Sequence, residues 1–340
     1  MDNKKISDAF NSFFINIGPS LAEKIKPSDF TPLSFMKTRN DNSMSLKPVI
    51  IDEVKSIIDN LKDGSSGWDE ISSRIVKSTY QSFLVPLTHI MNISILHGVF
   101  PNEMKIAKVI PLFKSGDVMI MSNYRPVSVL PLFSKILERL MYTRLLSFIN
   151  ENGLFYKYQF GFREGHSPNL AIIFLVDKIS NALEEGDYVL GLFLDFSKAF
   201  DTVNHTILFD KLEHYGVRGT ALSWFKSYLD NREQYVLFDG VESTRKQISC
   251  GVPQGSILGP LLFLLYINDL ALVSDKIFSL LFADDSNMFL NGKDPNQLIE
   301  TMNYEMKKVI SWLKANKLSL NLKKNSLYSI SQEMWKGLTQ

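Results

Sequence analysis

The sequence predicts an α+β fold, because helix and hairpin patterns alternate along one chain of 340 residues. Residues 133–149 place apolar side chains on one face at helical spacing. Residues 188–194 are almost continuously apolar, which is typical of a strand buried on both faces. Residues 277–281 and 287–290 are two short apolar runs around Phe282-Ala283-Asp284-Asp285, and this pattern predicts a tight β-hairpin.

The composition is that of a globular protein with a sizeable core, with 45% hydrophobic and 21% charged residues. Length alone suggests two domains, or one large domain with subdomains. The 37 basic and 36 acidic residues give a net charge of +1, so any nucleic-acid surface has to be local. One cysteine, Cys250, rules out an intrachain disulfide. The longest apolar run, residues 257–267, is too short to span a bilayer, so we expect no membrane segment and no secretory signal.

The first half of the chain predicts mostly helices. A short docking helix is expected around Phe10, Phe13 and Phe14, within a mixed, polar N-terminal region. Residues 51–61 have the spacing of an amphipathic helix, and a second helix is expected over residues 71–98.

A strand over residues 108–114 and a returning strand over residues 127–130 form the next predicted hairpin. It carries Lys108, Lys114 and Arg125. Three cations on one hairpin are usually a solvated face, and the functional alternative is a clamp for phosphate groups.

The second half adds helices with clear end signals. Ser167 and Pro168 are an N-cap and a first-turn proline for a helix that ends near Glu185, with Ile172, Val176, Ile179 and Leu183 facing inward. Asp294 and Pro295 begin another helix that runs to about Ala315, with Gln297 as the glutamine of a capping box. The remaining predicted elements are helices over residues 205–215 and 220–229, paired strands over 234–238 and 246–249, a helix from about Ser256 to Leu270, and a last strand over 318–322.

Carboxylates lie at the ends of two of these apolar segments. Asp284 and Asp285 occupy the hairpin turn, where adjacent like charges repel unless a cation or solvent compensates them. Asp195 ends the apolar strand, and its compensating partner could be Lys198, a helix N-terminus or a metal ion. If the strand and the hairpin share one sheet, the three carboxylates converge and could hold two divalent ions about 3.5–4 Å apart. The alternative is a solvated turn.

Six stretches, which include those around the carboxylates, occur in one order along the chain. They are Ser65-Ser66-Gly67-Trp68-Asp69, Asn123-Tyr124-Arg125-Pro126 with Phe133-Ser134-Lys135, Gln159-Phe160-Gly161-Phe162-Arg163, Leu194-Asp195-Phe196-Ser197, Gly251-Val252-Pro253-Gln254-Gly255 and Phe282-Ala283-Asp284-Asp285. In this order they resemble the lead-in, fingers and palm motifs of the reverse transcriptase domain of non-LTR (LINE-like) retrotransposons, over about residues 51–324.

The resemblance implies a fold and a set of catalytic residues. The fold would be the fingers and palm of a right-hand polymerase, with a small antiparallel palm sheet packed on helices. Asp195 and Asp284 match the metal-bridging carboxylates, and Asp285 the second aspartate of the hairpin. Two Mg²⁺ ions, or Mn²⁺ in their place, would be the cofactors. Lys324 matches a lysine that donates a proton to pyrophosphate; a solvated strand end shared with Lys323 is the alternative.

The resemblance also assigns nucleotide-binding residues. Arg125 matches the fingers arginine that contacts the incoming triphosphate, and Lys114 is a weaker match to the lysine before it. Phe200 occupies the position of a steric gate that excludes the ribose 2′-OH; ordinary core is the alternative. Gln254 matches the glutamine near the nascent base pair, and a role in fixing its own turn is the alternative.

The expected reaction is RNA-directed DNA synthesis on an RNA template, from a DNA primer and deoxynucleoside triphosphates. The domains expected are an N-terminal extension (1–46), lead-in and fingers (47–186), palm (187–331) and a frayed C-terminus (332–340), without a thumb, an endonuclease or an RNase H. Because no thumb is expected, the alternatives are a non-catalytic nucleic-acid-binding remnant and, less well matched, a two-metal nuclease. Localisation, oligomeric state and template stay open.

Overall fold

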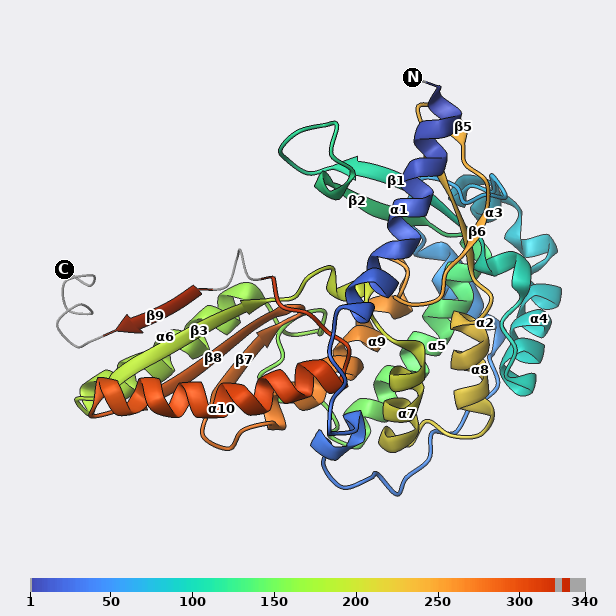
Figure 1. Ribbon diagram of the computed structural model, residues 1–340. Helices are drawn as coiled ribbons and strands as arrows, with labels where there is room; N and C mark the ends of the chain where they lie inside the picture. The colour runs from blue at the N-terminus through green and yellow to red at the C-terminus, as the bar shows by residue number, and fades with distance from the viewer. Residues whose placement is uncertain (1, 322–325, 331–340) are drawn as a thin grey trace. The chain divides into compact units, whose positions relative to one another are not determined.

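The computed structural model describes residues 2–321 and 326–330 (Figure 1). The chain forms two compact units that interleave along the sequence. Unit 1 contains residues 1–20, 39–154 and 200–262, and unit 2 contains residues 21–38, 155–199 and 263–340. The mixed α/β character agrees with the predicted fold class.

Unit 1 is built on a five-stranded sheet. Strands β1 (Ala107–Phe113) and β2 (Tyr124–Val129) pair in antiparallel fashion, and β1 pairs on its other edge with β4 (Glu233–Phe238) in parallel. Strands β5 (Val241–Glu242) and β6 (Lys246–Gln247) both pair with β4. The predicted hairpin of residues 108–130 is therefore confirmed. Its counterpart at residues 234–249 is confirmed too, with β5 as an additional strand.

Helix α1 (Asn3–Glu23) belongs to unit 1 through its first 18 residues and is longer than the predicted short helix. Phe10 packs against Tyr124 and Phe238, with ring centroids 4.9 Å and 5.4 Å apart. Asn11 is fully buried; its side-chain amide donates to the Gln234 carbonyl, and its Oδ1 accepts from the Gln234 side chain. These contacts fix the helix to the sheet, so the polar N-terminal region contributes to the core of this unit.

Six further helices complete unit 1. They are α2 (Ile51–Asp59), α3 (Ser73–Thr79), α4 (Leu84–His97), α5 (Leu132–Glu151), α7 (His205–Tyr215) and α8 (Thr220–Leu229). The predictions for α2, α5, α7 and α8 are confirmed. The single helix predicted over residues 71–98 is wrong, because α3 and α4 are separate. Pro86 lies in the first turn of α4, where its missing N–H needs no partner, whereas a proline inside a continuous helix would break it.

Unit 2 is built on a four-stranded antiparallel sheet with the order β7, β8, β3, β9. The strands are β7 (Phe278–Phe282), β8 (Asp285–Gly292), β3 (Tyr188–Asp195) and β9 (Ser326–Ile330). The expectation that the apolar strand and the aspartate hairpin share one sheet is confirmed. The strand predicted over residues 318–322 is wrong: Leu320 makes a single bridge to Phe196, and the edge strand begins later, at Ser326.

Helices α6 (Pro168–Glu184) and α10 (Pro295–Ala315) pack on this sheet (Figure 1). Ser167 caps α6 as predicted, by accepting a hydrogen bond from the Leu170 N–H. Ile179 and Leu183 are buried, but Ile172 and Val176, predicted to face inward, are exposed. Asp294 caps α10 through the Asn296 N–H.

Helix α9 (Leu258–Ile267) and six short 3₁₀ turns connect these elements. The Ser256 hydroxyl accepts a hydrogen bond from the Gly259 N–H, which supports the predicted start of α9. The 3₁₀ turns are η1 (Pro32–Phe35), η2 (Tyr80–Ser82), η3 (Asn102–Lys105), η4 (Met121–Asn123), η5 (Ala199–Asp201) and η6 (Asn268–Leu272). Across the described part of the chain, no helix combines the length and apolarity that a membrane crossing requires.

Candidate active site

Asp195 and Asp285 are direct cross-strand neighbours in the sheet of unit 2. They are the last residue of β3 and the first residue of β8, and their Cα atoms pair in the antiparallel register. Paired residues point to the same face of a sheet, so the two side chains lie beside each other. Asp284 directly precedes Asp285 and lies in the two-residue loop between β7 and β8. The structure thus brings two of the three predicted carboxylates onto one face and places the third in the adjoining turn.

Asn321 fixes the Asp195 carboxylate. The Asn321 side chain donates to Asp195 Oδ2 at 2.8 Å, and its backbone N–H donates to the Asp195 carbonyl at 2.8 Å. One Asp195 oxygen is therefore oriented by a neutral donor. No sequence pattern indicates this contact, because it depends on the path of the chain after α10.

The aspartate turn is held by Gln159. This side chain is 1% exposed, and its Oε1 accepts from the N–H groups of Ala283 (3.0 Å) and Gly161 (2.9 Å). The Phe160 N–H donates to the Leu281 carbonyl at 2.8 Å, and the Leu281 N–H donates to the Tyr158 carbonyl at 2.9 Å. A Cβ on Gly161 would lie 2.2 Å from the Ala283 nitrogen, so only glycine allows this approach. The motif that begins at Gln159 therefore supports the turn.

The backbone of the turn is itself constrained. Ala283 has φ +55°, which is uncommon for a residue with a Cβ, and it is buried. Such conformations persist when surrounding contacts determine them, and they concentrate at functional sites. The Gln159 hydrogen bond to the Ala283 N–H is one of those contacts.

A cavity of about 480 Å³ opens in unit 2 beside the carboxylates. Asp195, Asp285 and Asn287 form its polar side. Its apolar side comes from the sheet and from the first half of α6, and it comprises Pro168, Ala171, Ile172, Leu175, Phe193, Leu194, Leu280 and Phe282. Ile172 is exposed because it lines this cavity and not the core.

The carboxylates suit a magnesium ion that is completed by a substrate. Within residues 2–321 and 326–330, no three His, Cys, Asp or Glu side chains gather closely enough to form a metal site by themselves. Mg²⁺ in polymerase-type sites commonly uses one or two carboxylates together with waters and substrate phosphates. The hard oxygen donors of Asp195 and Asp285, beside a cavity, fit that coordination.

In unit 1, Lys114 and Arg125 lie on the β1–β2 hairpin. Arg125 pairs with Leu112, and Lys114 lies two residues after Leu112, directly after the end of β1; an extended chain there places the two cations on the same face. Both side chains are exposed. This face could be solvated or could bind an anion, as the sequence predicted.

Gln254 ties its own turn to two neighbouring segments of unit 1. Its Nε2 donates to Asp201 Oδ1 at 2.7 Å, and its carbonyl accepts from the Ser128 N–H at 2.8 Å. Gly255 has φ +123°, and a Cβ there would lie 2.4 Å from the Ser128 carbonyl oxygen. The alternative that Gln254 fixes the turn is therefore supported by these contacts.

Phe200 is half-buried, and its carbonyl accepts from the Val252 N–H at 2.9 Å. It lies in η5, directly before Asp201. The side chain is therefore not enclosed as a fully buried core residue would be. Lys324 and its neighbour Lys323 lie outside the described residues.

Glu138 anchors the segment after Gln254, and sequence reasoning missed it. This carboxylate is fully buried in α5 and accepts from the N–H groups of Ile257 (2.7 Å) and Leu258 (3.1 Å). Burial raises its pKa, while the nearby charge of Arg232 and these hydrogen bonds lower it in part. The sequence signal was weak, because Glu138 has both polar and apolar neighbours one turn away on the helix, Ser134 and Lys135 before it and Met141 after it.

Comparison with known proteins agrees with this geometry. Residues 112–336 match the family model described as reverse transcriptase (RNA-dependent DNA polymerase). The RNA-directed DNA polymerase from mobile element jockey of Drosophila melanogaster is 31% identical over 290 residues, covering 81% of this chain and 32% of that protein.

Two further relatives come from the same organism. The probable RNA-directed DNA polymerase from transposon X-element is 31% identical, covering 78% of this chain and 30% of that protein. The putative 115 kDa protein in type-1 retrotransposable element R1DM is 30% identical, covering 76% of this chain and 25% of that protein. The chain spans about a third or less of the length of these relatives. The motif order, the family model and these relatives together show that the chain belongs to the reverse transcriptase (RNA-dependent DNA polymerase) family, in the group found in non-LTR retrotransposons.

Proposed function

We propose that this chain catalyses RNA-directed DNA synthesis, adding deoxynucleotides to the 3′-OH of a DNA primer on an RNA template. The observation that carries the proposal is the cross-strand pair Asp195 and Asp285, with Asp284 in the adjoining turn and a cavity beside them. Family membership makes a nucleotidyl transfer the reaction that this arrangement best supports.

The carboxylates have distinct proposed roles. Asp195, oriented by Asn321, and Asp284 are the principal metal ligands, and Asp285 is the more weakly bound one. Two bound Mg²⁺ ions, or Mn²⁺, would lower the pKa of the primer 3′-OH and neutralise charge on the transferred phosphate. The chain's own contribution is to hold these carboxylates in a fixed arrangement through Gln159 and Asn321.

The remaining roles concern the nucleotide. In this proposal unit 2 supplies the palm, and the β1–β2 hairpin of unit 1 belongs to the fingers. Arg125 and Lys114 bind the triphosphate, Gln254 lies near the new base pair, and Phe200 excludes a ribose 2′-OH. Lys324 donates a proton to the leaving pyrophosphate. The template, the primer and the deoxynucleoside triphosphates are the partners.

Primer extension tests the proposal directly. The wild-type chain is expected to extend a DNA primer on an RNA template with Mg²⁺, and Asp284→Ala should reduce extension by at least about 10³-fold, because the electrostatic stabilisation of the transition state is lost. Asp275→Ala, which removes an exposed aspartate of the same unit, is the matched control and should retain activity. Absence of extension by folded wild-type protein that still binds RNA would favour the non-catalytic alternative.

A second test addresses sugar selection. Phe200→Ala should raise ribonucleotide incorporation relative to deoxynucleotide incorporation by about 10-fold or more, because an aromatic ring no longer opposes the 2′-OH. Single-nucleotide extension with matched dNTP and rNTP measures the ratio of kcat/KM values. Phe200→Tyr keeps the ring and should keep the discrimination. An unchanged ratio in Phe200→Ala would remove the steric-gate assignment.

A further inference from the structure

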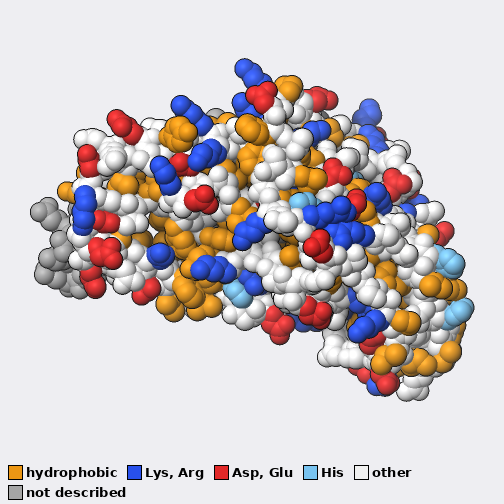
Figure 2. Space-filling view, turned by 90° about the horizontal axis from the view of Figure 1, so that it is seen from below, with side chains coloured by type: hydrophobic (Ala, Val, Ile, Leu, Met, Phe, Trp, Pro, Cys, Tyr) orange, Lys and Arg blue, Asp and Glu red, His pale blue; other side chains and the backbone are white. Residues whose placement is uncertain are grey.

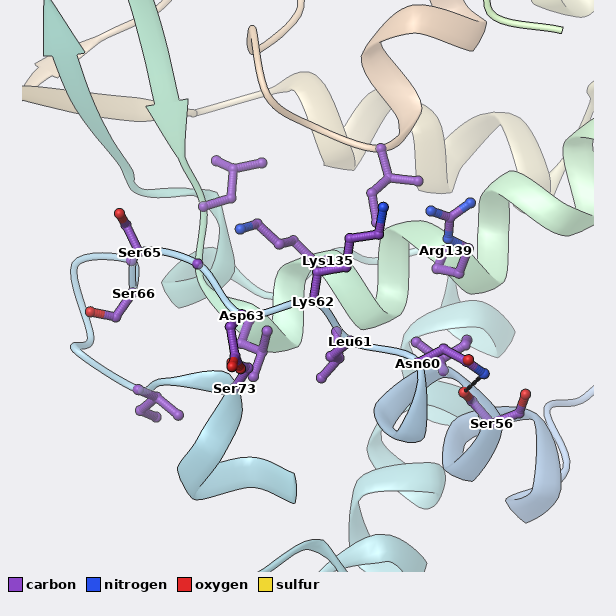
Figure 3. A pocket seen from close by; sticks show the side chains of 17 residues that line it. Ser56, Asn60, Leu61, Lys62, Asp63, Ser65, Ser66, Ser73, Lys135 and Arg139 are labelled. Atoms are coloured by element: carbon purple, nitrogen blue, oxygen red, sulfur yellow. Dashed lines mark hydrogen bonds between the residues drawn. The ribbon is translucent and has the colours of Figure 1, made fainter. Parts of the chain in front are cut away.

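A cavity of about 540 Å³ lies wholly within unit 1 (Figure 3). The segment of residues 61–67 forms one wall, and the first turns of α5 form another. Lys62 comes from the segment, and Lys135 and Arg139 come from α5. Figure 3 shows Lys62 on the segment and Lys135 and Arg139 on the helix.

Among the described residues, no carboxylate lies within ion-pair distance of the three cations. None of Lys62, Lys135 and Arg139 forms an ion pair there, although the chain contains almost equal numbers of acids and bases. Asp63, the single acid of the lining, accepts a hydrogen bond from the Ser73 hydroxyl at 2.8 Å. The lining therefore has a formal charge of +2. Lys135 is half-buried, and burial lowers its pKa, while the charges of Glu138 and Asp69 offset part of this effect; a bound anion would stabilise its charged form further.

The segment also offers main-chain donors. The N–H groups of residues 62–66 have no acceptor within the described residues, and these residues adopt no helix or strand. Gly67 fixes the end of the segment, because a Cβ there would lie 2.7 Å from the Pro131 nitrogen at the start of α5. Successive backbone N–H groups without an internal acceptor, beside cationic side chains, are suited to bind an anion.

The types of side chain in the lining also limit the chemical class of the ligand. None of the 17 lining residues is aromatic, so a nucleobase would find no ring to stack on. The serine hydroxyls of Ser65 and Ser66 and the cations instead suit phosphate oxygens. We propose that this cavity binds a phosphate ester group through Lys62, Lys135, Arg139 and the N–H groups of residues 62–66. All residues of the cavity belong to unit 1, and the proposal does not rest on the chemistry proposed for unit 2.

The phosphate could belong to a nucleic-acid backbone or to a free phosphate compound, and two binding assays on the full chain distinguish these sources. The first measures fluorescence anisotropy of a single-stranded RNA of about 12 nucleotides at several salt concentrations without nucleotide or divalent ion. The second measures binding of inorganic pyrophosphate by calorimetry. Arg139→Gln and Lys135→Gln are compared with Arg74→Gln and Lys77→Gln, which remove exposed cations of α3 outside the cavity.

For a backbone phosphate, Arg139→Gln and Lys135→Gln should each weaken RNA binding about three- to tenfold and reduce the slope of log K against log salt by about 0.7, with the controls near wild type. For a free phosphate compound, the same variants should abolish pyrophosphate binding and leave RNA binding unchanged. Cavity variants that match the control variants in both assays, with unchanged thermal unfolding, would overturn the proposal. Primer extension is measured separately, so loss of polymerase activity would not be confused with loss of this site.

Discussion

Gln159 holds the aspartate turn through one side-chain oxygen that serves two backbone donors. The residue is buried, and the two N–H groups that it satisfies belong to Ala283 and Gly161. Ala283 has a positive φ, so its conformation depends on such contacts. A glutamine outside the acidic set thereby controls where Asp284 lies.

Replacing Gln159 by alanine is expected to lower the free energy of unfolding by about 2–5 kcal/mol, because two buried N–H groups lose their acceptor. It should also reduce kcat for primer extension while leaving KM for the nucleotide nearly unchanged, since the residue acts through the turn. Urea unfolding and steady-state kinetics measure the two effects. Gln81→Ala, at an exposed glutamine, is the control. A change in KM alone would contradict the positioning role.

At the scale of elements, α5 and the segment before α9 are joined by one buried carboxylate. Glu138 accepts from the N–H groups of Ile257 and Leu258, close to the Gln254 turn. The buried Arg232 supplies a compensating positive charge nearby. The position of the turn therefore depends on a residue more than a hundred positions earlier in the chain.

Glu138→Ala should destabilise the chain by about 3–5 kcal/mol, because it leaves two N–H groups unsatisfied and the Arg232 charge uncompensated. Chemical denaturation measures this loss, and Glu151→Ala, at the exposed end of α5, should change it little. A loss of less than about 1 kcal/mol in the free energy of unfolding would show that the hydrogen bonds of Glu138 contribute little to stability.

The raised pKa of Glu138 also predicts a pH dependence. The Glu138 carboxyl group stays protonated to higher pH in the folded state than in the unfolded state. The stability from this group is therefore complete below the unfolded pKa and is lost as the pH rises through the folded pKa. In the Glu138→Ala variant, the free energy of unfolding should lack this part of its decline with rising pH.

Elements with strong local signals could be predicted from the sequence. Ser167 and Pro168 define the start of α6, and Asp294 and Pro295 the start of α10. The break between α3 and α4 and the position of β9 could not be predicted in the same way. The apolar spacing of residues 71–98 continues through Pro86, and edge-strand pairing depends on which residues reach β3.

At the scale of the whole molecule, the net charge of +1 leaves no large field of one sign. On the face in Figure 2, basic and acidic side chains are interspersed with apolar ones. Nucleic-acid affinity is therefore expected to come from local groups such as the hairpin cations Lys114 and Arg125.

Metal binding gives a measurement on the whole chain that is independent of catalysis. Mg²⁺ together with a dNTP should raise the Tm by about 2–4 °C over the dNTP alone, because ligands that bind only the folded state stabilise it. EDTA should reverse the shift, and Asp195→Asn should abolish it. The Asp275→Ala variant should show the wild-type shift. Equal shifts in Asp195→Asn and wild type would show that the ions bind elsewhere.

The sequence by itself determined the family, the α+β class, most helices and the candidate carboxylates, because motifs and periodic patterns are local properties of the chain. The tertiary structure decided that Asp195 pairs with Asp285, that Gln159, Asn321 and Glu138 hold the neighbouring segments, and that Lys62, Lys135 and Arg139 line one cavity. These relations join residues that are far apart in the chain. They depend on strand register and helix packing, which no local pattern specifies.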